Sequence, residues 1–173
     1  MEAPSLDYIE AARLQGLRPG ATVCLINGQR LLMFYQKEYD LWQIPQGGIL
    51  QGEAVDEAIK REMTEELGGG IVTRIQFPSA YVGENQVIFP PEKLGGEMLD
   101  LADARQVVMQ GKKYFFMAVE LASPEVSIKE TQFDDYKWAD FLEALNTADS
   151  VYQRGKKRIT IDAVHSLRRA RWL

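Results

Sequence analysis

The sequence predicts a single α/β domain in which a mixed β-sheet lies between helices. Short apolar, β-prone runs alternate along the chain with helical patterns, and no internal repeat is present. With 173 residues, 46% of them hydrophobic, the chain is long enough for one sizeable core. We expect residues 1–16 to form an N-terminal extension and residues 17–173 to form the domain.

Hydrophobic runs bounded by turn residues predict the elements of the first half. Asn27-Gly28 is a strong hairpin signal between two apolar, β-prone runs. The elements expected here are a weak helix over residues 5–15 and strands over residues 21–26, 30–35 and 41–44.

A helix is predicted over residues 53–67. Its apolar residues recur at every fourth position and form a stripe for the core, and three glycines at 68–70 end it. The apolar stripe consists of Val55, Ile59, Met63 and Leu67.

The second half is expected to contain a central strand over residues 113–121, where nearly every residue is apolar, as in a strand buried on both faces. Residues 90–111 contain Pro90-Pro91 and Gly95-Gly96 and show no clear period, which predicts a loop. The other elements expected are strands over residues 71–77, 86–89 and 135–138 and helices over residues 139–145 and 156–171.

The predicted helix over residues 53–67 also carries three glutamates on one face. Residues three and four apart on a helix are neighbours, so Glu62, Glu65 and Glu66 project their carboxylates into one small volume. A hard divalent cation such as magnesium, which prefers oxygen ligands, would compensate their repulsion. The alternative is an ordinary solvated acidic face.

The spacing around these glutamates resembles the signature of the Nudix hydrolase family. All fixed positions of the signature except the last are filled, by Gly47, Glu53, Arg61-Glu62-Met63, Glu65-Glu66 and Gly68. At the last position, Gly69 stands in place of a bulky aliphatic residue. The resemblance implies a Nudix-type α/β/α sandwich with a mixed sheet.

The resemblance also implies the roles of the site residues. Glu62, Glu65 and Glu66 would be catalytic residues and ligands of Mg²⁺, with Mn²⁺ as the alternative. The Gly47 carbonyl would be a further metal ligand. Arg61 would support catalysis by pairing with a carboxylate, with Glu53 in a similar supporting role. The implied reaction is hydrolysis of a phosphoanhydride bond in a diphosphate linked to another group.

A narrower resemblance begins at residues 42–49, Trp-Gln-Ile-Pro-Gln-Gly-Gly-Ile, and extends over most of residues 17–167. It points to the Nudix branch that contains RNA pyrophosphohydrolases and dinucleoside polyphosphate hydrolases. The substrate contacts that it implies are Arg18, Gln46, Gly48, Lys113, Tyr114 and Lys157, with Arg158 as the alternative to Lys157. Tyr39 and Tyr81, like Tyr114, are candidates for stacking on a base.

Two departures from that branch concern catalysis and base recognition. Gln132 stands where a glutamate is expected before Phe133-Asp134, and glutamine cannot act as a base. Glu130, one strand period earlier, is the catalytic replacement that we consider, with Glu65 or Glu66 as the alternative. Lys156 replaces an expected stacking aromatic before the pair Lys157-Arg158.

Composition is that of an intracellular enzyme. Cys24, the one cysteine, is expected in the core, and His165, the one histidine, is expected to be structural. No apolar run approaches the length of a membrane span, so the cytoplasm is expected. The net charge of −5 argues against a general nucleic-acid binder. The basic residues after position 151 would attract a polyphosphate or RNA 5′ end, or would form an ordinary solvated helix face.

The sequence therefore predicts a magnesium-dependent Nudix pyrophosphohydrolase. The preferred substrates would be an RNA 5′-triphosphate end or a dinucleoside polyphosphate. The alternatives are a hydrolase of free nucleoside triphosphates or nucleotide sugars and a non-catalytic nucleotide-binding module. No stable protein partner can be inferred.

Overall fold

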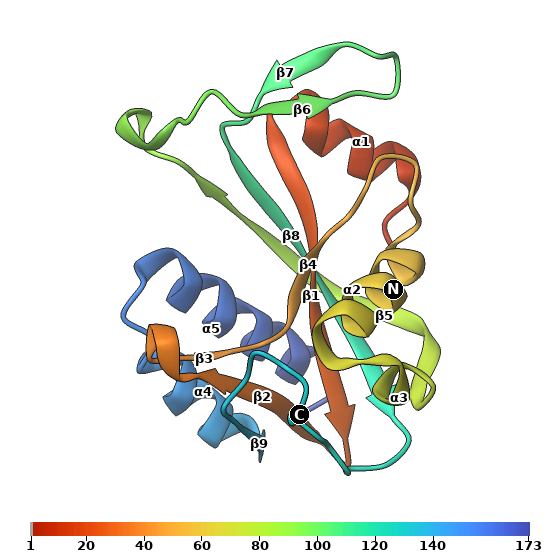
Figure 1. Cartoon of the computed structure of the whole chain (residues 1–173), viewed down its shortest axis with the longest axis vertical. Coiled ribbons are helices and arrows are strands. Elements are labelled where there is room, and N and C mark those ends of the chain that lie inside the picture. Colours follow the sequence, from red (N-terminus) through yellow and green to blue (C-terminus); the bar gives the residue numbers. More distant parts are fainter. Residues whose placement is uncertain (1) are drawn as a thin grey trace.

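Two long parallel strands form the centre of a seven-stranded sheet in the computed structural model, which describes residues 2–173 (Figure 1). β1 (Leu17–Asn27) and β8 (Gly111–Leu121) lie side by side in continuous register, from Leu17 opposite Gly111 to Ile26 opposite Glu120. The apolar run predicted as a central strand is therefore central, and its parallel pairing makes the sheet mixed.

The other strands of the sheet pair antiparallel with their neighbours. The order is β3-β2-β1-β8-β5, with β4 attached to β1 and β9 attached to β2. The hairpin predicted at Asn27-Gly28 joins β1 to β2, with Gly28 and Gln29 both at positive φ, as a tight primed turn requires. These strands are β2 (Arg30–Gln36), β3 (Leu41–Gln43), β4 (Gln46–Gly48), β5 (Ile75–Ile88) and β9 (Asp135–Ala139).

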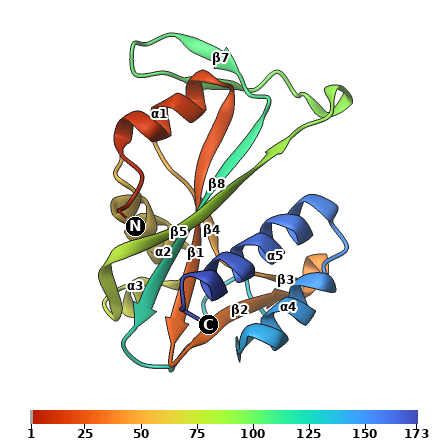
Figure 2. The ribbon, with the colours of Figure 1, turned by 180° about the vertical axis from the view of Figure 1, so that it is seen from behind.

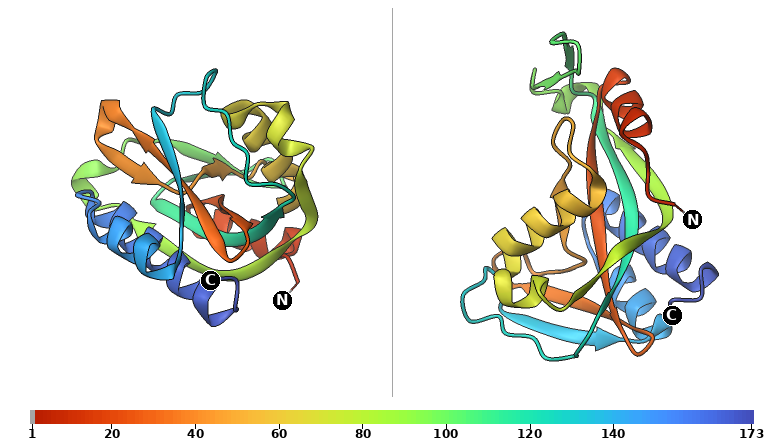
Figure 3. Two further views of the ribbon diagram at one scale, coloured as in Figure 1. Left: turned by 90° about the horizontal axis from the view of Figure 1, so that it is seen from below. Right: turned by 90° about the vertical axis from the view of Figure 1, so that its right-hand side faces the viewer.

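Helices cover both faces of the sheet, so the α/β/α arrangement is confirmed (Figure 3). α2 (Val55–Leu67) and α3 (Gly69–Val72) pack on one face, and all four residues of the apolar stripe of α2 are buried there. α4 (Phe141–Asp149) and α5 (Arg154–Arg169) pack side by side on the other face (Figure 2). Each helix in residues 2–173 is too short or too polar to cross a bilayer.

The N-terminal segment folds onto the domain. α1 (Leu6–Leu14) is capped by the Ser5 hydroxyl, which accepts a hydrogen bond from the amide of Tyr8. Ile9 is 1% exposed and belongs to the same core as the buried residues of α2. The division into an extension and a domain remains a prediction, but α1 contributes to the core.

The structure corrects the region after α2. Residues 71–77 were expected to form a strand, but α3 occupies residues 69–72, and a single strand, β5, then runs through the residues predicted as two. β5 shifts register against β8 between Gln76 and Ala80 and again between Tyr81 and Gly83. Such bulges break the two-residue alternation on which strand prediction depends.

The expected loop over residues 90–111 contains a small two-stranded sheet. β6 (Met98–Asp100) pairs with β7 (Gln106–Val108), and Met98 lies opposite Val108. Strands of three residues are too short to show a period, so no sequence pattern predicted this β6–β7 hairpin. Two 3₁₀ turns, at Lys37–Tyr39 and Pro91–Lys93, complete the backbone.

The buried Cys24 is confirmed as a core residue. Its side chain is fully enclosed, and burial raises the pKa of its thiol to about 12. A thiol held neutral in this way packs as a small apolar group.

We predict that Ile9→Ala lowers the free energy of unfolding by about 2–4 kcal/mol, because it removes a buried side chain from the shared core. Leu6→Ala, on the same helix but 52% exposed, should change it by less than about 0.5 kcal/mol. Urea unfolding of both variants measures this. Equal, small effects would mean that α1 is an accessory extension.

Candidate active site

The carboxylates of α2 are held in place by the burial of the apolar stripe of the same helix. Glu62 and Glu66 flank this buried stripe and are themselves partly buried, whereas Glu65 lies on the exposed side of α2. The Glu62 side chain is 17% exposed and that of Glu65 is 62% exposed. The cluster therefore runs from a sheltered end at Glu62 to an open end at Glu65.

Arg61 fixes the sheltered end of this cluster. Its Nε and Nη2 donate to the two carboxylate oxygens of Glu53, each at 2.8 Å, and its Nη1 donates to Glu62 Oε1 at 2.6 Å. The bonds to Arg61 hold the pKa of the Glu53 carboxyl below its ordinary value. Nη2 also donates to the carbonyl oxygen of Gly48 at 2.8 Å. One guanidinium thus joins the start of α2 to the preceding strand, which fits a supporting role for Arg61 and Glu53.

The negative charge of Glu66 is opposed by its surroundings. Burial, together with the charges of Glu62 and Glu65, raises the pKa of Glu66 to about 7. A divalent cation would relieve this repulsion, and an all-oxygen donor set suits Mg²⁺ or Mn²⁺. In the described chain no three acidic, histidine or cysteine side chains already converge as an ion site. The argument for a bound cation therefore rests on the chemistry of these carboxylate oxygens and on the burial of Glu66.

Gly47 allows Glu62 to lie directly against β4. A Cβ built on Gly47 would fall 2.1 Å from Glu62 Cγ, far inside van der Waals contact. Any side chain at this position would push α2 away from β4 or displace the Glu62 carboxylate. The glycine is thus required by the close approach of a helix side chain to a strand backbone.

The direction of the β4 carbonyls changes the prediction for Gly47. The Pro45 carbonyl accepts a hydrogen bond from the Val23 amide, and the Ile49 amide donates to the Pro19 carbonyl. In an antiparallel pair every second residue points its backbone groups at the neighbouring strand, so Gly47, midway between Pro45 and Ile49 and opposite Ala21, also points toward β1. The Gly47 carbonyl accordingly lies beside Gly20 of β1. The Gly48 carbonyl accepts a hydrogen bond from Arg61, on the α2 side. The Gln46 carbonyl, two residues earlier on the same strand, points the same way. The structure therefore directs the Gln46 and Gly48 carbonyls, and not that of Gly47, away from β1.

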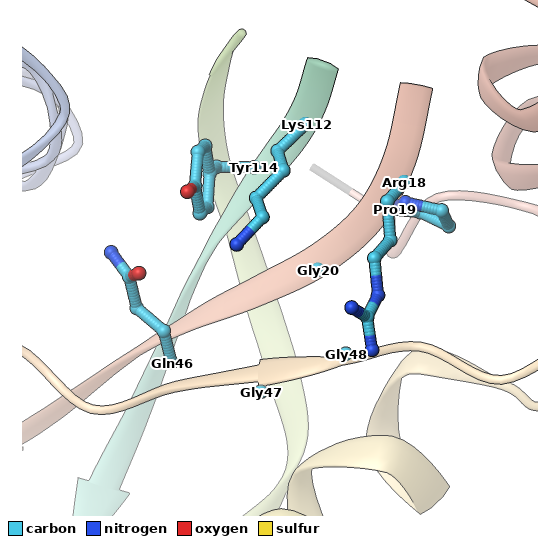
Figure 4. A pocket seen from close by; sticks show the side chains of 8 residues that line it. All are labelled: Arg18, Pro19, Gly20, Gln46, Gly47, Gly48, Lys112 and Tyr114. Atoms are coloured by element: carbon cyan, nitrogen blue, oxygen red, sulfur yellow. The ribbon is translucent and has the colours of Figure 1, made fainter. Parts of the chain in front are cut away.

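A cavity of about 240 Å³ lies on the other side of β4 from Glu62 (Figure 4). Four of the predicted substrate contacts, Arg18, Gln46, Gly48 and Tyr114, line it. All three residues of β4, Gln46, Gly47 and Gly48, line this cavity, and Gly47 also packs on Glu62. β4 is thus a shared wall between the carboxylate cluster and the cavity.

The charge in this cavity is positive. Arg18 of β1 and Lys112 of β8 both extend into it, and Figure 4 shows their nitrogens pointing toward β4. Burial lowers the pKa of Lys112, and the charge of Arg18 lowers it further. Two cations beside a glycine-lined strand form a suitable site for phosphate oxygens. Lys112 was not among the substrate contacts predicted from the sequence.

Lys113 lies outside this cavity. It follows Lys112 on β8, so its side chain points to the opposite face of the sheet. Its ammonium is 2.7 Å from a Glu84 carboxylate oxygen and 4.9 Å from the centre of the Tyr8 ring. Tyr81 donates to the same carboxylate at 2.7 Å, so it belongs to this second cluster as well. Neither Lys113 nor Tyr81 meets Tyr114.

Lys157 is also outside the cavity. It lies 3.7 Å from Asp149 and lines a separate surface hollow on α5. Other basic residues of α5 make structural contacts. Arg158 donates to the carbonyl of Gln86 at 2.8 Å, and Arg168 lies over the Phe141 ring. Instead Lys156 lines a small cleft together with Gln46.

Glu130 and Gln132 are exposed in the loop over residues 122–134. Phe133 stacks on Phe34 and anchors this loop to the core that α2 shares. Figure 3 shows the loop passing beside α2 and α3. The structure thus places the Glu130 loop near the carboxylate helix but gives no contact between Glu130 and the cluster.

The Nudix domain model matches residues 16–159 of this chain. An RNA pyrophosphohydrolase of Mannheimia succiniciproducens is 32% identical over 155 residues, which span 82% of this chain and 73% of that protein. An RNA pyrophosphohydrolase of Aliivibrio fischeri is 26% identical over 160 residues, which span 86% of this chain and 89% of that protein.

Solved structures show the same fold at low sequence identity. A Caenorhabditis elegans Ap4A hydrolase in a binary complex superposes with a TM-score of 0.56 at 15% identity, over 89% of this chain and 97% of that one. The Escherichia coli dihydroneopterin triphosphate pyrophosphohydrolase superposes with a TM-score of 0.55 at 15% identity, over 86% and 97%.

We predict that Gly47→Ala lowers the free energy of unfolding by about 1–3 kcal/mol, because the added methyl collides with Glu62. Gly48→Ala is the matched control, since the atom nearest to its built Cβ is Arg18 Nη2 at 3.8 Å. It should change stability by less than about 0.5 kcal/mol. Chemical denaturation of both variants measures the difference, and a tolerated Gly47→Ala would show that β4 and α2 do not meet as closely as described.

Proposed function

Because the chain belongs to the Nudix family, and is therefore a Nudix hydrolase, we propose that it is a magnesium-dependent pyrophosphohydrolase of nucleotide polyphosphates. The substrates that we propose are RNA 5′-triphosphate ends and dinucleoside polyphosphates, both of which join a nucleoside to a run of phosphates. The RNA pyrophosphohydrolases named above support the first. Either substrate would place the activity in the cytoplasm.

One arrangement carries this proposal. A cluster of three carboxylates and a cavity with two cations adjoin the same three-residue strand, β4. A polyphosphate needs both environments, because its oxygens bind cations directly and bind carboxylates only through a metal ion. Arg18 and Lys112 would hold the phosphates, and Tyr114 offers an aromatic face for the base.

Glu62, Glu65 and Glu66, together with a main-chain carbonyl of β4, would hold the metal ion. When bound, Mg²⁺ supplies neutralisation of phosphate charge and a more acidic water molecule. Arg61 would keep Glu62 in position through its bonds to Glu53 and Gly48.

The reaction proposed is attack by water on phosphorus. The water oxygen bonds to phosphorus, the bridging P–O bond breaks, and its electron pair leaves with the departing phosphate, while a proton passes to the general base. Glu65 or Glu66 is the base we favour, because both belong to the α2 cluster. Glu130 is the second candidate, because its loop packs beside that helix.

The experiment that tests this function is a parallel assay with Mg²⁺. The substrates are triphosphorylated RNA, diadenosine tetraphosphate, the common nucleoside triphosphates and a nucleotide sugar. We expect one of the first two to be hydrolysed with the highest kcat/KM. A clear preference for a free triphosphate or a nucleotide sugar would replace the substrate assignment. Nucleotide binding without any turnover would favour a non-catalytic module.

We predict that Glu65→Gln and Glu66→Gln each lower kcat by about 100-fold or more, because each removes charge that stabilises the transition state. Glu120→Gln is the matched control, since Glu120 is exposed near the end of β8 and faces away from the α2 core. Thermal unfolding should show all three variants folded. Full activity in both α2 variants would refute hydrolysis at this cluster.

A further inference from the structure

A second cavity, of about 250 Å³, adjoins the cationic one, and nothing in the proposed function uses it. Arg18 and Pro19 line both cavities, so the Arg18 side chain stands where the two meet. One wall of the second cavity is the loop that joins β4 to α2. The other wall is β6, in the β6–β7 hairpin that the sequence did not predict. Figure 1 shows this loop rising toward α1, below the hairpin.

Each wall of this second cavity exposes a large apolar side chain. Leu50, on the loop, is 57% exposed and Met98, on β6, is 44% exposed. Exposed apolar residues gathered on one concave surface mark a binding site more often than isolated ones do. A flat apolar group placed between the walls would cover both side chains.

The polar groups of the second cavity differ from those of the first. Glu97 and Asp100 contribute carboxylates, and Glu97 lies 3.8 Å from Arg18. Carboxylates repel phosphate but accept hydrogen bonds from the amino groups of a nucleobase or the hydroxyl groups of a ribose. The charge layout therefore favours phosphates at Arg18 and Lys112 and a neutral, hydrogen-bonding group beyond them.

Both walls of the second cavity are braced by α1. Arg13, 5% exposed, donates to the carbonyl of Ile49 in the loop. It also lies 3.4 Å from Glu10, and the other carboxylate oxygen of Glu10 accepts from the amide of Ala102, after β6, at 2.7 Å. A buried arginine with these partners fixes the loop and the hairpin relative to each other, so the cavity is a built feature of the fold.

We infer that the second cavity binds the far nucleoside of a dinucleoside polyphosphate. This inference rests on the proposed function and specifies its substrate. One nucleoside lies against Tyr114, the phosphate chain passes Arg18, and the other nucleoside lies between Leu50 and Met98. A dinucleotide has a nucleoside at both ends of its phosphates, which matches two chambers joined at an arginine.

The test compares diadenosine tetraphosphate with adenosine 5′-tetraphosphate, which has the same number of phosphates but lacks the second nucleoside. The ratio of their kcat/KM values measures the preference for the dinucleotide. We expect a ratio of about ten or more in the unmodified protein, and a several-fold lower ratio in Met98→Ser, which removes one apolar wall.

Leu94→Ser is the matched control. Leu94 is 41% exposed in the same segment but does not line the cavity, so this variant should keep the original ratio. A ratio near one, or an equal ratio in all three proteins, would overturn the second site. An equal loss of kcat/KM on triphosphorylated RNA in Met98→Ser, with no loss in Leu94→Ser, would overturn it and would indicate that the cavity binds a nucleotide of RNA.

If neither tetraphosphate is hydrolysed, the dinucleotide part of the proposed function fails separately. Equilibrium binding of the same two compounds to the same three proteins, measured by calorimetry, then decides the second site without turnover. Tighter binding of the dinucleotide that Met98→Ser weakens and Leu94→Ser does not would support the site. Equal affinities would reject it.

Discussion

The close contact between Glu62 and the backbone of Gly47 is the constraint on which the rest of the site depends. It joins a helix to a strand at a distance that only glycine permits. The helix reaches this position because its apolar stripe is buried in the core, and the strand does so because β4 pairs with β1. Arg61 spans the same joint through Gly48 and Glu53. This joint holds Glu62 against β4, with Glu65 and Glu66 on the same helix, and a divalent cation would compensate the charge of the three carboxylates.

β4 lies between the carboxylates of α2 and the cations Arg18 and Lys112 of the first cavity. A polyphosphate that follows this boundary meets cations directly and carboxylates through metal. The β6–β7 hairpin adds a second chamber beside Arg18, with two carboxylates and exposed apolar side chains in its walls. The position of this hairpin therefore bears on substrate choice, whereas the α2 cluster bears on the chemistry.

The sequence predicted the helices, most strands and the carboxylate cluster, because each has a strong local pattern. The apolar stripe of α2 and the run around Phe115 are examples. It failed where the pattern was short or broken, at β6, β7 and the bulged β5. The family resemblance implied substrate contacts for both Lys113 and Tyr114, but neighbours on a strand face opposite ways, and only Tyr114 lines the cavity. Counting by two from Tyr114 would have found Lys112. The direction of the Gly47 carbonyl depends on the pairing of β4 with β1, which no local signal indicated.

The most direct test of this account is the location of a bound metal ion. Crystals of the protein soaked in Mn²⁺ would be measured near the manganese absorption edge, where anomalous scattering identifies the ion. We predict a peak bounded by Glu62, Glu65 and Glu66 on one side and the main chain of β4 on the other. A peak elsewhere, or no peak while Glu62 stays bonded to Arg61 at saturating Mn²⁺, would contradict it.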